Sequence, residues 1–475
     1  MRARRAPGPT VLQALRALRD RDLLATLTAL HAEHGDVSGF YYIGKSWIML
    51  RAPEHIEHVL VANNDNYRKS YDYRLLAVVT GKGLLTNEGD DWTKQRRTIQ
   101  PMFAGRHLDR FAGDMTAAAE HALERWDRLP DRMRVDVAHE MSALTLDVVG
   151  RALFGSDLAG AGAEIGPAVT VGLRTAIGFA RIPFMWLWPQ WAINLGAAIL
   201  FRLPIPMLRR IGRATRTLDR VANQLIEARI ASGEQHDDLL GLLLAARDPE
   251  TGAAMSRRQI RDELMTFLLA GHETTATGLA WMWYLLSQTP EARDRVFAEV
   301  DEVLGGRAPV AGDAGNLPWT AACFQEAMRL YPPAWILERD AIGRDEVGGY
   351  TIPKRATVII SPWVVHRNPA LWPDPERFDA TRFLPGASAG RPRSAYMPFG
   401  AGRRMCVGAG FAMLEGTLLA AMIAQRFVFE LAGDAVVVPE PTATLRPRDG
   451  LPMIVHRRSA GAARGSVSFP EAAGG

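Results

Sequence analysis

Apolar side chains recur at helical spacing through most of the chain between about residues 90 and 335. Within this region, helices are expected to begin near His107 and Leu208. A longer helix is expected over about 255–288, where two apolar runs flank a short polar stretch. A second helical region is expected at about 406–428. Helices should therefore make up most of the structure.

Short runs of alternating apolar and polar residues, bounded by glycine and proline, predict β-rich portions at about 37–65, 337–365 and 430–456. They do not alternate with helices in a βαβ series, which disfavours a doubly wound parallel sheet. We therefore expect residues 1–458 to form a single fold, mainly α with a smaller β-rich portion (α+β). The small and polar residues 459–475 are expected to be a disordered tail.

Composition narrows the class of protein without defining its function. The chain has 475 residues, of which 48% are hydrophobic, and a formal net charge of only +4. There is no basic stripe with interleaved aromatic residues, so no nucleic-acid partner is expected. The only cysteines, Cys323 and Cys406, cannot form a disulfide framework. This usage fits a reducing compartment, and we expect a cytoplasmic protein.

The most apolar stretch lies at about 184–203, where Pro189, Gln190 and Asn194 interrupt it. These interruptions argue against a membrane-spanning helix, and the N-terminus has no apolar run long enough for an anchor. Two interpretations remain. The stretch forms either an exposed apolar surface with peripheral membrane contact or a buried part of the core.

The strongest chemical signal is the glycine- and arginine-rich loop around Cys406, with an apolar helix directly after it. A cysteine without such a context is usually a small buried apolar residue. Here the positive end of the following helix and the nearby arginines should lower the pKa of the thiol. Glycines also let the backbone come close to the sulfur and to a flat ligand. The loop therefore predicts that Cys406 is a thiolate.

This loop resembles the haem loop of the cytochrome P-450 superfamily, Phe-x-x-Gly-x-Arg-x-Cys-x-Gly. All five specified positions match, and they are Phe399, Gly402, Arg404, Cys406 and Gly408. The resemblance covers roughly residues 36–456. It implies the cytochrome P-450 fold, a triangular helical domain with haem b buried between two long helices. Cys406 would be the axial ligand of the haem iron.

A second motif, Ala270-Gly-His-Glu-Thr-Thr275, lies inside the long central helix. A threonine hydroxyl in a helix often bonds the carbonyl one turn back and bends the helix. Such a bend at Thr274 would open a small groove beside Gly271 in which dioxygen could lie. In the resembled family this is the oxygen-activation motif. The resemblance therefore implies Thr274 as the catalytic hydroxyl and Glu273 as the catalytic acid, and gives His272 no role.

Other motifs have weaker signals, and the resemblance gives them roles. Glu326 and Arg329 share a helix face and, with Arg382 rather than Arg377, would form a structural triad. Trp92 and Arg96 lie four residues apart, and an arginine suits a haem propionate. The expected cofactor-binding residues are Trp92, Arg96, Arg339, Phe399, Gly402, Arg404, Cys406 and Gly408.

The resemblance also implies partners. The substrate would be a hydrophobic small molecule, such as a fatty acid, terpene, steroid or polyketide, oxidised with O2. Electrons would come from a ferredoxin or flavodoxin and its reductase, and we expect a monomer. Candidate pocket residues are Tyr73, Leu76, Phe267, Ala270, Trp335 and Ala443. Five basic residues would form either a docking face for the redox partner or only a solvated basic surface, and they are Lys94, Arg97, Arg391, Arg393 and Arg403.

Two other functions share the thiolate loop. One is a haem-thiolate enzyme that needs no dioxygen, such as a peroxygenase or isomerase, and the other is a haem sensor without catalysis. Family members of the first kind usually lack the acid–threonine pair, and a sensor has no need of one. Glu273 and Thr274 therefore favour the monooxygenase.

Overall fold

The computed structural model describes residues 4–10, 22–42, 44–155, 168, 188–200, 202, 205–234 and 236–458. The tail expected at 459–475 lies outside the described residues, as do 184–187, 201 and 203 of the apolar stretch. None of the helices in the described ranges is long and apolar enough to cross a membrane.

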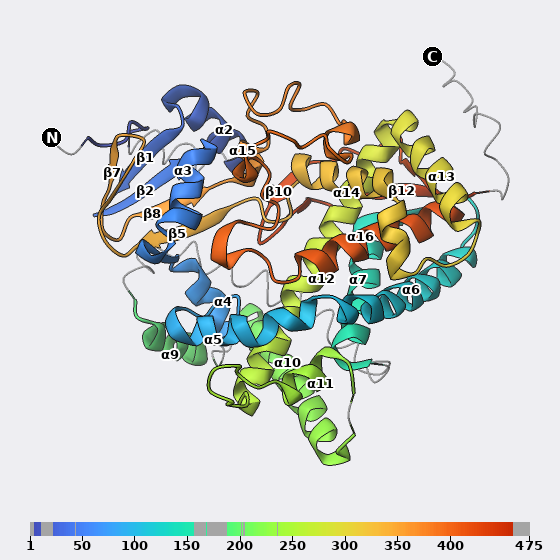
Figure 1. Ribbon diagram of the computed structural model, residues 1–475, viewed down its shortest axis with the longest axis horizontal. Helices are drawn as coiled ribbons and strands as arrows, with labels where there is room; N and C mark the ends of the chain where they lie inside the picture. Colours follow the sequence, from blue (N-terminus) through green and yellow to red (C-terminus); the bar gives the residue numbers. More distant parts are fainter. Residues whose placement is uncertain are drawn as a thin grey trace.

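Helices form the larger part of the molecule, and α12 (Arg257–Gln288) runs through its middle (Figure 1). Ser256 caps this helix, since its hydroxyl oxygen accepts the Gln259 N–H while the Gln259 side chain accepts the Ser256 N–H. The remaining helices are α2 (Leu23–His34), α3 (Pro53–Glu57), α4 (Asp72–Thr80), α5 (Gly89–Ile99), α6 (Arg106–Asp127), α7 (Val137–Phe154), α9 (Gln190–Leu200), α10 (Pro206–Ser232), α11 (Leu239–Ala245), α13 (Pro290–Leu304), α14 (Pro318–Leu330), α15 (Pro362–Val365) and α16 (Ala409–Arg426).

A five-stranded sheet forms the β-rich part, at the upper left of Figure 1. Its strand order is β1-β2-β8-β5-β3, in which β2 and β8 are parallel and the other neighbours antiparallel. A three-stranded sheet has the order β4-β12-β9, and two hairpins are β6–β7 and β10–β11. The strands are β1 (Val37–Tyr42), β2 (Lys45–Leu50), β3 (Tyr67–Lys69), β4 (Met133–Asp136), β5 (Leu337–Ala341), β6 (Asp345–Val347), β7 (Tyr350–Ile352), β8 (Thr357–Ile360), β9 (Phe427–Leu431), β10 (Pro439–Pro441), β11 (Leu445–Pro447) and β12 (Pro452–Arg457).

The main hydrophobic core lies among the helices and surrounds α12, which is buried on most sides. The helix α7 packs closely against α12 at Gly271, where a Cβ would lie only 3.0 Å from Cγ2 of Val149. A second cluster lies under the five-stranded sheet and includes Ile48 and Val358. Leu75 of α4 and Ile193 of α9 form a small separate cluster. The core therefore fixes α12 between α7 and the C-terminal elements.

Two short strands, β3 and β4, lie outside the β-rich portions expected from the sequence. They have three and four residues, too few to show a period of two. β3 is paired with β5 and β4 with β12, so both depend on partners far away in the chain.

Candidate active site

The loop around Cys406 is held tightly between the helices and the sheet region. The Cys406 N–H donates to the Phe399 carbonyl at 2.9 Å, and the Met405 N–H donates to Gly402 at 3.1 Å. Gly402 has φ +68°, and a Cβ there would lie 2.0 Å from the Leu60 carbonyl oxygen. Only glycine allows both that conformation and that approach. The loop therefore presents Cys406 just before α16 begins.

Cys406 is exposed, whereas Cys323 is buried. Although the residue is exposed, the protein around its sulfur desolvates the Cys406 thiol and raises its pKa, and the Gly408 N–H and the Arg96 guanidinium oppose this rise. The sequence predicted that backbone N–H groups and arginines lower this pKa. Both causes are present, but desolvation of the thiol outweighs them. A thiol in such a place becomes a thiolate when a metal ion holds it.

On the facing helix, Thr274 makes the hydrogen bond that the sequence suggested. Its hydroxyl donates to the Ala270 carbonyl at 2.7 Å. Ala270 is exposed although the residues before it on α12, from Asp262 to Leu269, are buried. This exposed point in the middle of a buried helix is where a ligand can approach α12.

Of the two residues Ala270 and Gly271, only Ala270 is exposed. Gly271 faces α7, where Val149 occupies the space next to it. The neighbouring His272 is buried and bonds the Leu268 carbonyl through Nδ1 at 3.3 Å. Burial lowers the pKa of His272 to about 4. Gly271 and His272 therefore serve packing against α7, and Ala270 lies on the open side.

Glu273, the expected acid, interacts with the tip of the β10–β11 hairpin. The Thr444 hydroxyl donates to Oε1 of Glu273 at 2.9 Å. Thr444 is buried, and its neighbour Ala443 is exposed. The structure therefore joins the acid on α12 to a loop in which the sequence indicated only a pocket residue.

Trp92 and Arg404 lie together, with the Arg404 guanidinium over the indole ring at 4.2 Å from its centroid. Arg404 also donates to Oε2 of Glu88 at 2.5 Å. The other oxygen of Glu88 accepts the Lys69 N–H at 2.8 Å. Burial lowers the pKa of Arg404, and the charges of Arg339 and Arg403 add to this while Glu88 opposes it.

Arg339 and Lys69 face each other across β5 and β3. Burial, followed by the charge of Arg404, lowers the pKa of Lys69 well below its usual value. Arg339 is 5% exposed, and its Nε has no hydrogen-bond partner among the described residues. Lys69, Arg339 and Arg404 thus lie close to one another, and two carboxylates, Glu88 and Glu263, act on Lys69. Such a cluster fits additional carboxylates from a ligand, as haem propionates would supply.

Arg96 makes hydrogen bonds to other groups than those that Arg404 and Lys69 contact. It donates to the Met405 carbonyl at 2.7 Å and to the side chain of Gln100 at 3.1 Å. Arg96 therefore holds the backbone immediately before Cys406. Its charge also acts on the thiol.

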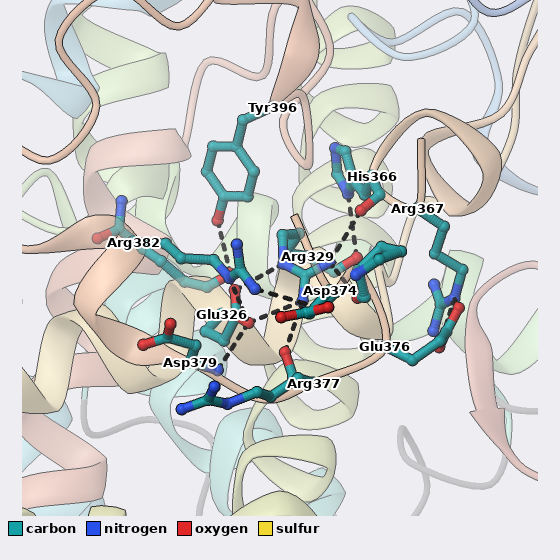
Figure 2. Close-up of polar contacts among 12 residues, drawn as sticks. Glu326, Arg329, His366, Arg367, Asp374, Glu376, Arg377, Asp379, Arg382 and Tyr396 are labelled. Atoms are coloured by element: carbon teal, nitrogen blue, oxygen red, sulfur yellow. Dashed lines mark hydrogen bonds and ion pairs between the residues drawn. The ribbon is translucent and has the colours of Figure 1, made fainter. Parts of the chain in front are cut away.

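Glu326 and Arg329 form a fully buried ion pair on α14, shown in Figure 2. Arg382 lies 3.6 Å from Oε1 of Glu326 through its Nε, whereas Arg377 contributes its backbone carbonyl to Arg329. The Asp379 N–H also donates to Glu326 at 2.9 Å. The structure therefore brings together the three side chains that were expected to form a structural triad.

His366 connects this cluster to the segment that leads into the Cys406 loop (Figure 2). Its Nδ1 lies 3.2 Å from the Arg329 carbonyl, and its Nε2 accepts the Met397 N–H at 2.9 Å. Burial, followed by the charge of Arg329, lowers the pKa of His366 to about 3. The imidazole is therefore neutral and structural.

The six candidate pocket residues differ in how open they are. Ala270 and Ala443 are exposed, and Tyr73 and Leu76 on α4 are half-buried. Phe267 is buried, with its ring 5.3 Å from that of Phe103. Trp335 belongs to a core cluster and donates through Nε1 to the Thr442 carbonyl at 2.8 Å. Its placement favours a structural role over the expected role in lining the pocket.

Three residues of the site were missed by sequence reasoning, namely Lys69, His366 as a link, and Thr444. The alternation Tyr67-Arg-Lys69 is too short to reveal a strand, so it gave no sign that Lys69 faces Arg339. The threonine next to Ala443 in Thr-Ala-Thr-Leu-Arg-Pro was a usable signal, because a hydroxyl beside a pocket residue can reach a nearby acid.

Known proteins with similar sequences and structures show the family to which the chain belongs. The family model for cytochrome P450 matches residues 4–452. Cyclooctatin synthase of Streptomyces melanosporofaciens is 38% identical, over 93% of this chain and 92% of that protein. Pentalenene oxygenase of Streptomyces avermitilis is 32% identical, over 93% of this chain and 94% of that protein.

The crystal structure of the cytochrome P450DA heme domain superposes with a TM-score of 0.84 at 26% identity. The superposition covers 96% of this chain and 98% of that one. The mainly α fold expected from the sequence is thereby confirmed. The family and the fold imply a haem cofactor. The chain belongs to the cytochrome P450 family and is a cytochrome P450 monooxygenase.

Proposed function

We propose that this enzyme inserts one oxygen atom of O2 into a C–H or C=C bond of an apolar small molecule, with electrons from a separate protein. The observation that carries the proposal is the Thr274 hydroxyl on the Ala270 carbonyl, at the exposed point of α12. The neighbouring carboxyl of Glu273 supplies an acid at the same place. A haem sensor would have no use for this pair.

The cofactor would be haem b, and Cys406 would supply a thiolate ligand to its iron. Arg339, Arg404 and Lys69 form the set of cations that suits its two carboxylates, and Trp92 lies under Arg404. When bound, the haem supplies the iron at which dioxygen is reduced and cleaved, a reaction that a thiolate ligand favours.

Thr274 and Glu273 manage protons at this site. Because the Thr274 proton is directed to the Ala270 carbonyl, the hydroxyl oxygen can accept a hydrogen bond from a water molecule on the exposed side. Glu273, the preceding residue, can supply exchangeable protons to that water. Orderly delivery of protons keeps electrons from being lost as hydrogen peroxide.

The substrate is a terpene-like hydrocarbon. The candidate pocket residues Leu76, Phe267, Ala270 and Ala443 are apolar, which suits a hydrophobic ligand. Fatty acids, steroids and polyketides satisfy this chemistry equally well. Among the four classes, the names of cyclooctatin synthase and pentalenene oxygenase favour a terpene.

Two measurements on the haem-loaded enzyme test this function. Carbon monoxide added to the reduced protein should give the strongly red-shifted Soret band of a thiolate-ligated haem. Product from a terpene panel should then form with a ferredoxin, its reductase and O2, and at a much lower rate with peroxide alone. Product that forms only with peroxide would show a peroxygenase and overturn the proposal.

The redox partner is an acidic ferredoxin or flavodoxin that meets the enzyme in the cytoplasm, and the enzyme acts as a monomer. Of the five basic residues expected on the docking face, Lys94, Arg393 and Arg403 are exposed. Arg97 is paired with Asp248 at 2.6 Å, and the Arg391 guanidinium stacks on Trp372 at 4.2 Å. Arg403 is also paired, with Asp65 at 2.8 Å, but that pair is itself exposed. The docking face is therefore reduced to the three exposed cations.

The helix α9 makes peripheral contact with an anionic membrane surface. Trp191, Leu195 and Ile199 are 69%, 54% and 54% exposed and lie at spacings of four residues, on one side of the helix. Arg202 and Arg209 are exposed just beyond its C-terminal end. An exposed apolar stripe bordered by arginines is typical of helices that lie in a lipid interface.

Flotation with vesicles tests this contact. The enzyme should float with phosphatidylglycerol vesicles and much less with phosphatidylcholine vesicles. Replacing Trp191, Leu195 and Ile199 together by serine should abolish flotation while haem content is retained. Equal flotation of this variant and the unchanged enzyme would remove the assignment.

A further inference from the structure

The tip of the β10–β11 hairpin is fixed in place by three hydrogen bonds with two other segments, α12 and the loop that contains Pro333 and Trp335. Trp335 donates to the Thr442 carbonyl, Trp281 of α12 donates to the Leu445 carbonyl at 2.7 Å, and the Leu445 N–H donates to Pro333 at 3.1 Å. Within the tip, the Thr442 hydroxyl and N–H both reach the Thr444 carbonyl. The position of Thr444 is therefore set by a well-supported backbone.

The hairpin meets α12 at two points on one side of the helix. Glu273 accepts the Thr444 hydroxyl at 2.9 Å, and Trp281 donates to the Leu445 carbonyl. These residues are two helical turns apart, about 12 Å along the axis. The Trp281 ring is itself fixed, since it stacks on Tyr331 with the centroids 3.9 Å apart. The hydrogen bond from Trp281 to Leu445 therefore restricts movement of the neighbouring Thr444, which bonds Glu273.

The same tip carries Ala443, which is exposed, next to the buried Thr444. Glu273 is likewise next to Thr274, whose hydroxyl is bonded at the exposed point of α12. The hydrogen bond from Thr444 to Glu273 therefore connects the hairpin tip, where Ala443 is exposed, to the two residues proposed to deliver protons. A hydrogen bond to a charged carboxylate fixes its direction as well as stabilising it.

We propose that Thr444 is a positioning residue for Glu273, which holds the carboxylate in the direction needed for proton delivery at Thr274. Through Ala443, the position of the carboxylate also responds to a substrate that touches the hairpin. This inference rests on the proposed monooxygenase function, in which Glu273 supplies protons. It assigns Thr444 no direct contact with the reacting atoms.

The test compares Thr444→Val with Glu273→Gln in the haem-loaded enzyme, with a ferredoxin system as electron source and pentalenene as the probe. Hydrogen peroxide released per NADPH oxidised is measured over a range of pH, together with amide hydrogen exchange at Thr444 and Leu445. Thr444→Val removes the bond. Glu273→Gln keeps an oxygen that can accept the bond but removes the acid.

Thr444→Val should accelerate exchange at the tip and raise the peroxide fraction, with an effect of roughly tenfold, as expected for one hydrogen bond to a charged group. The pH dependence of peroxide release should also move to higher pH, because the hydroxyl no longer favours the ionised carboxylate. Thr444→Ser keeps the hydroxyl and should show the normal peroxide fraction and the normal pH dependence. Glu273→Gln should raise peroxide release without faster exchange.

The two variants distinguish the acid role of Glu273 from the positioning role of Thr444. If Glu273→Gln leaves peroxide release unchanged, the proposed acid role fails, whatever Thr444→Val does. If Glu273→Gln raises peroxide release while Thr444→Val keeps the normal release and pH profile, the positioning role alone is wrong. Thr442→Val removes a hydroxyl that bonds within the hairpin. An equal effect of that variant would show general loosening of the tip and overturn the assignment to Thr444.

Discussion

Arg329 donates to both carboxylate oxygens of Glu326 at 2.7 Å, and both side chains are fully buried. Its remaining N–H groups reach the carbonyls of His366 and Pro375. One guanidinium thus joins α14 to two segments of the long loop region before Cys406. This arrangement makes the pair a structural element rather than part of the catalytic chemistry.

Glu326→Ala should destabilise the enzyme by about 3–5 kcal/mol, because it leaves the Arg329 charge buried without its carboxylate. Urea unfolding of the variant and the unchanged protein measures the difference. Asp147→Ala is the control, since Asp147 pairs with Arg151 at a partly exposed site and should cost below about 1 kcal/mol. Similar costs for the two variants would contradict the structural role of the pair.

Thr274→Ala should divert electrons to hydrogen peroxide and lower product formation, because the hydroxyl on the Ala270 carbonyl is lost. The rate of NADPH oxidation should change much less than the yield of product. Thr274→Ser keeps the hydroxyl and should retain most of the normal coupling. The claim is wrong if the alanine variant forms product with unchanged efficiency.

Lys94→Glu and Arg403→Glu should each slow reduction by a ferredoxin, most strongly at low salt, because they reverse charges on the exposed docking face. Binding of a terpene, followed by its spectral shift, should not change. Stopped-flow reduction kinetics measure the first effect. Arg210→Glu on α10 is the matched control and should reduce at the normal rate. Equal reduction rates in all variants would remove the docking assignment.

Glu415 on α16 gives the enzyme a stability that depends on pH. Burial raises the pKa of this fully buried carboxyl to about 8, and Thr275 opposes the rise only in part. The folded protein keeps the proton to higher pH than the unfolded chain. This contribution is present below the ordinary glutamate range near 4.5 and is progressively lost as the pH rises toward about 8.

Replacing Glu415 by glutamine should therefore reduce the loss of stability between about pH 5 and 8, by an amount on the order of a few kcal/mol. Urea unfolding at several pH values, with Glu140→Gln at a more exposed site as the control, measures it. A variant whose stability falls as steeply as that of the unchanged protein would show that another group causes the dependence.

The sequence was sufficient for those features that depend on neighbours in the chain. The Cys406 loop, the Glu326–Arg329 pair and the Thr274 bond to Ala270 all lie within a few residues of one another, so spacing reveals them. The cluster of Lys69 with Arg339 and the bond from Thr444 to Glu273 join residues hundreds of positions apart or in very short strands. Those contacts depend on tertiary packing.

The exposure of Ala270 rather than Gly271 could not be predicted from the sequence for a different reason. Helical periodicity places both residues near the bend but does not say which side of α12 meets α7. Val149 decides this, because it occupies the space beside Gly271. The net rise in the pKa of the Cys406 thiol has a similar origin, since desolvation depends on how many elements enclose the loop.

The contrast between the two cysteines gives the enzyme a built-in reporter. Cys323 is buried at 0% exposure and Cys406 is exposed, so a thiol reagent has one accessible target in the folded chain. Coordination of the sulfur would block that target. Counting reactive thiols per polypeptide would therefore measure the fraction of cofactor-loaded enzyme by a chemical titration that needs no absorption spectrum.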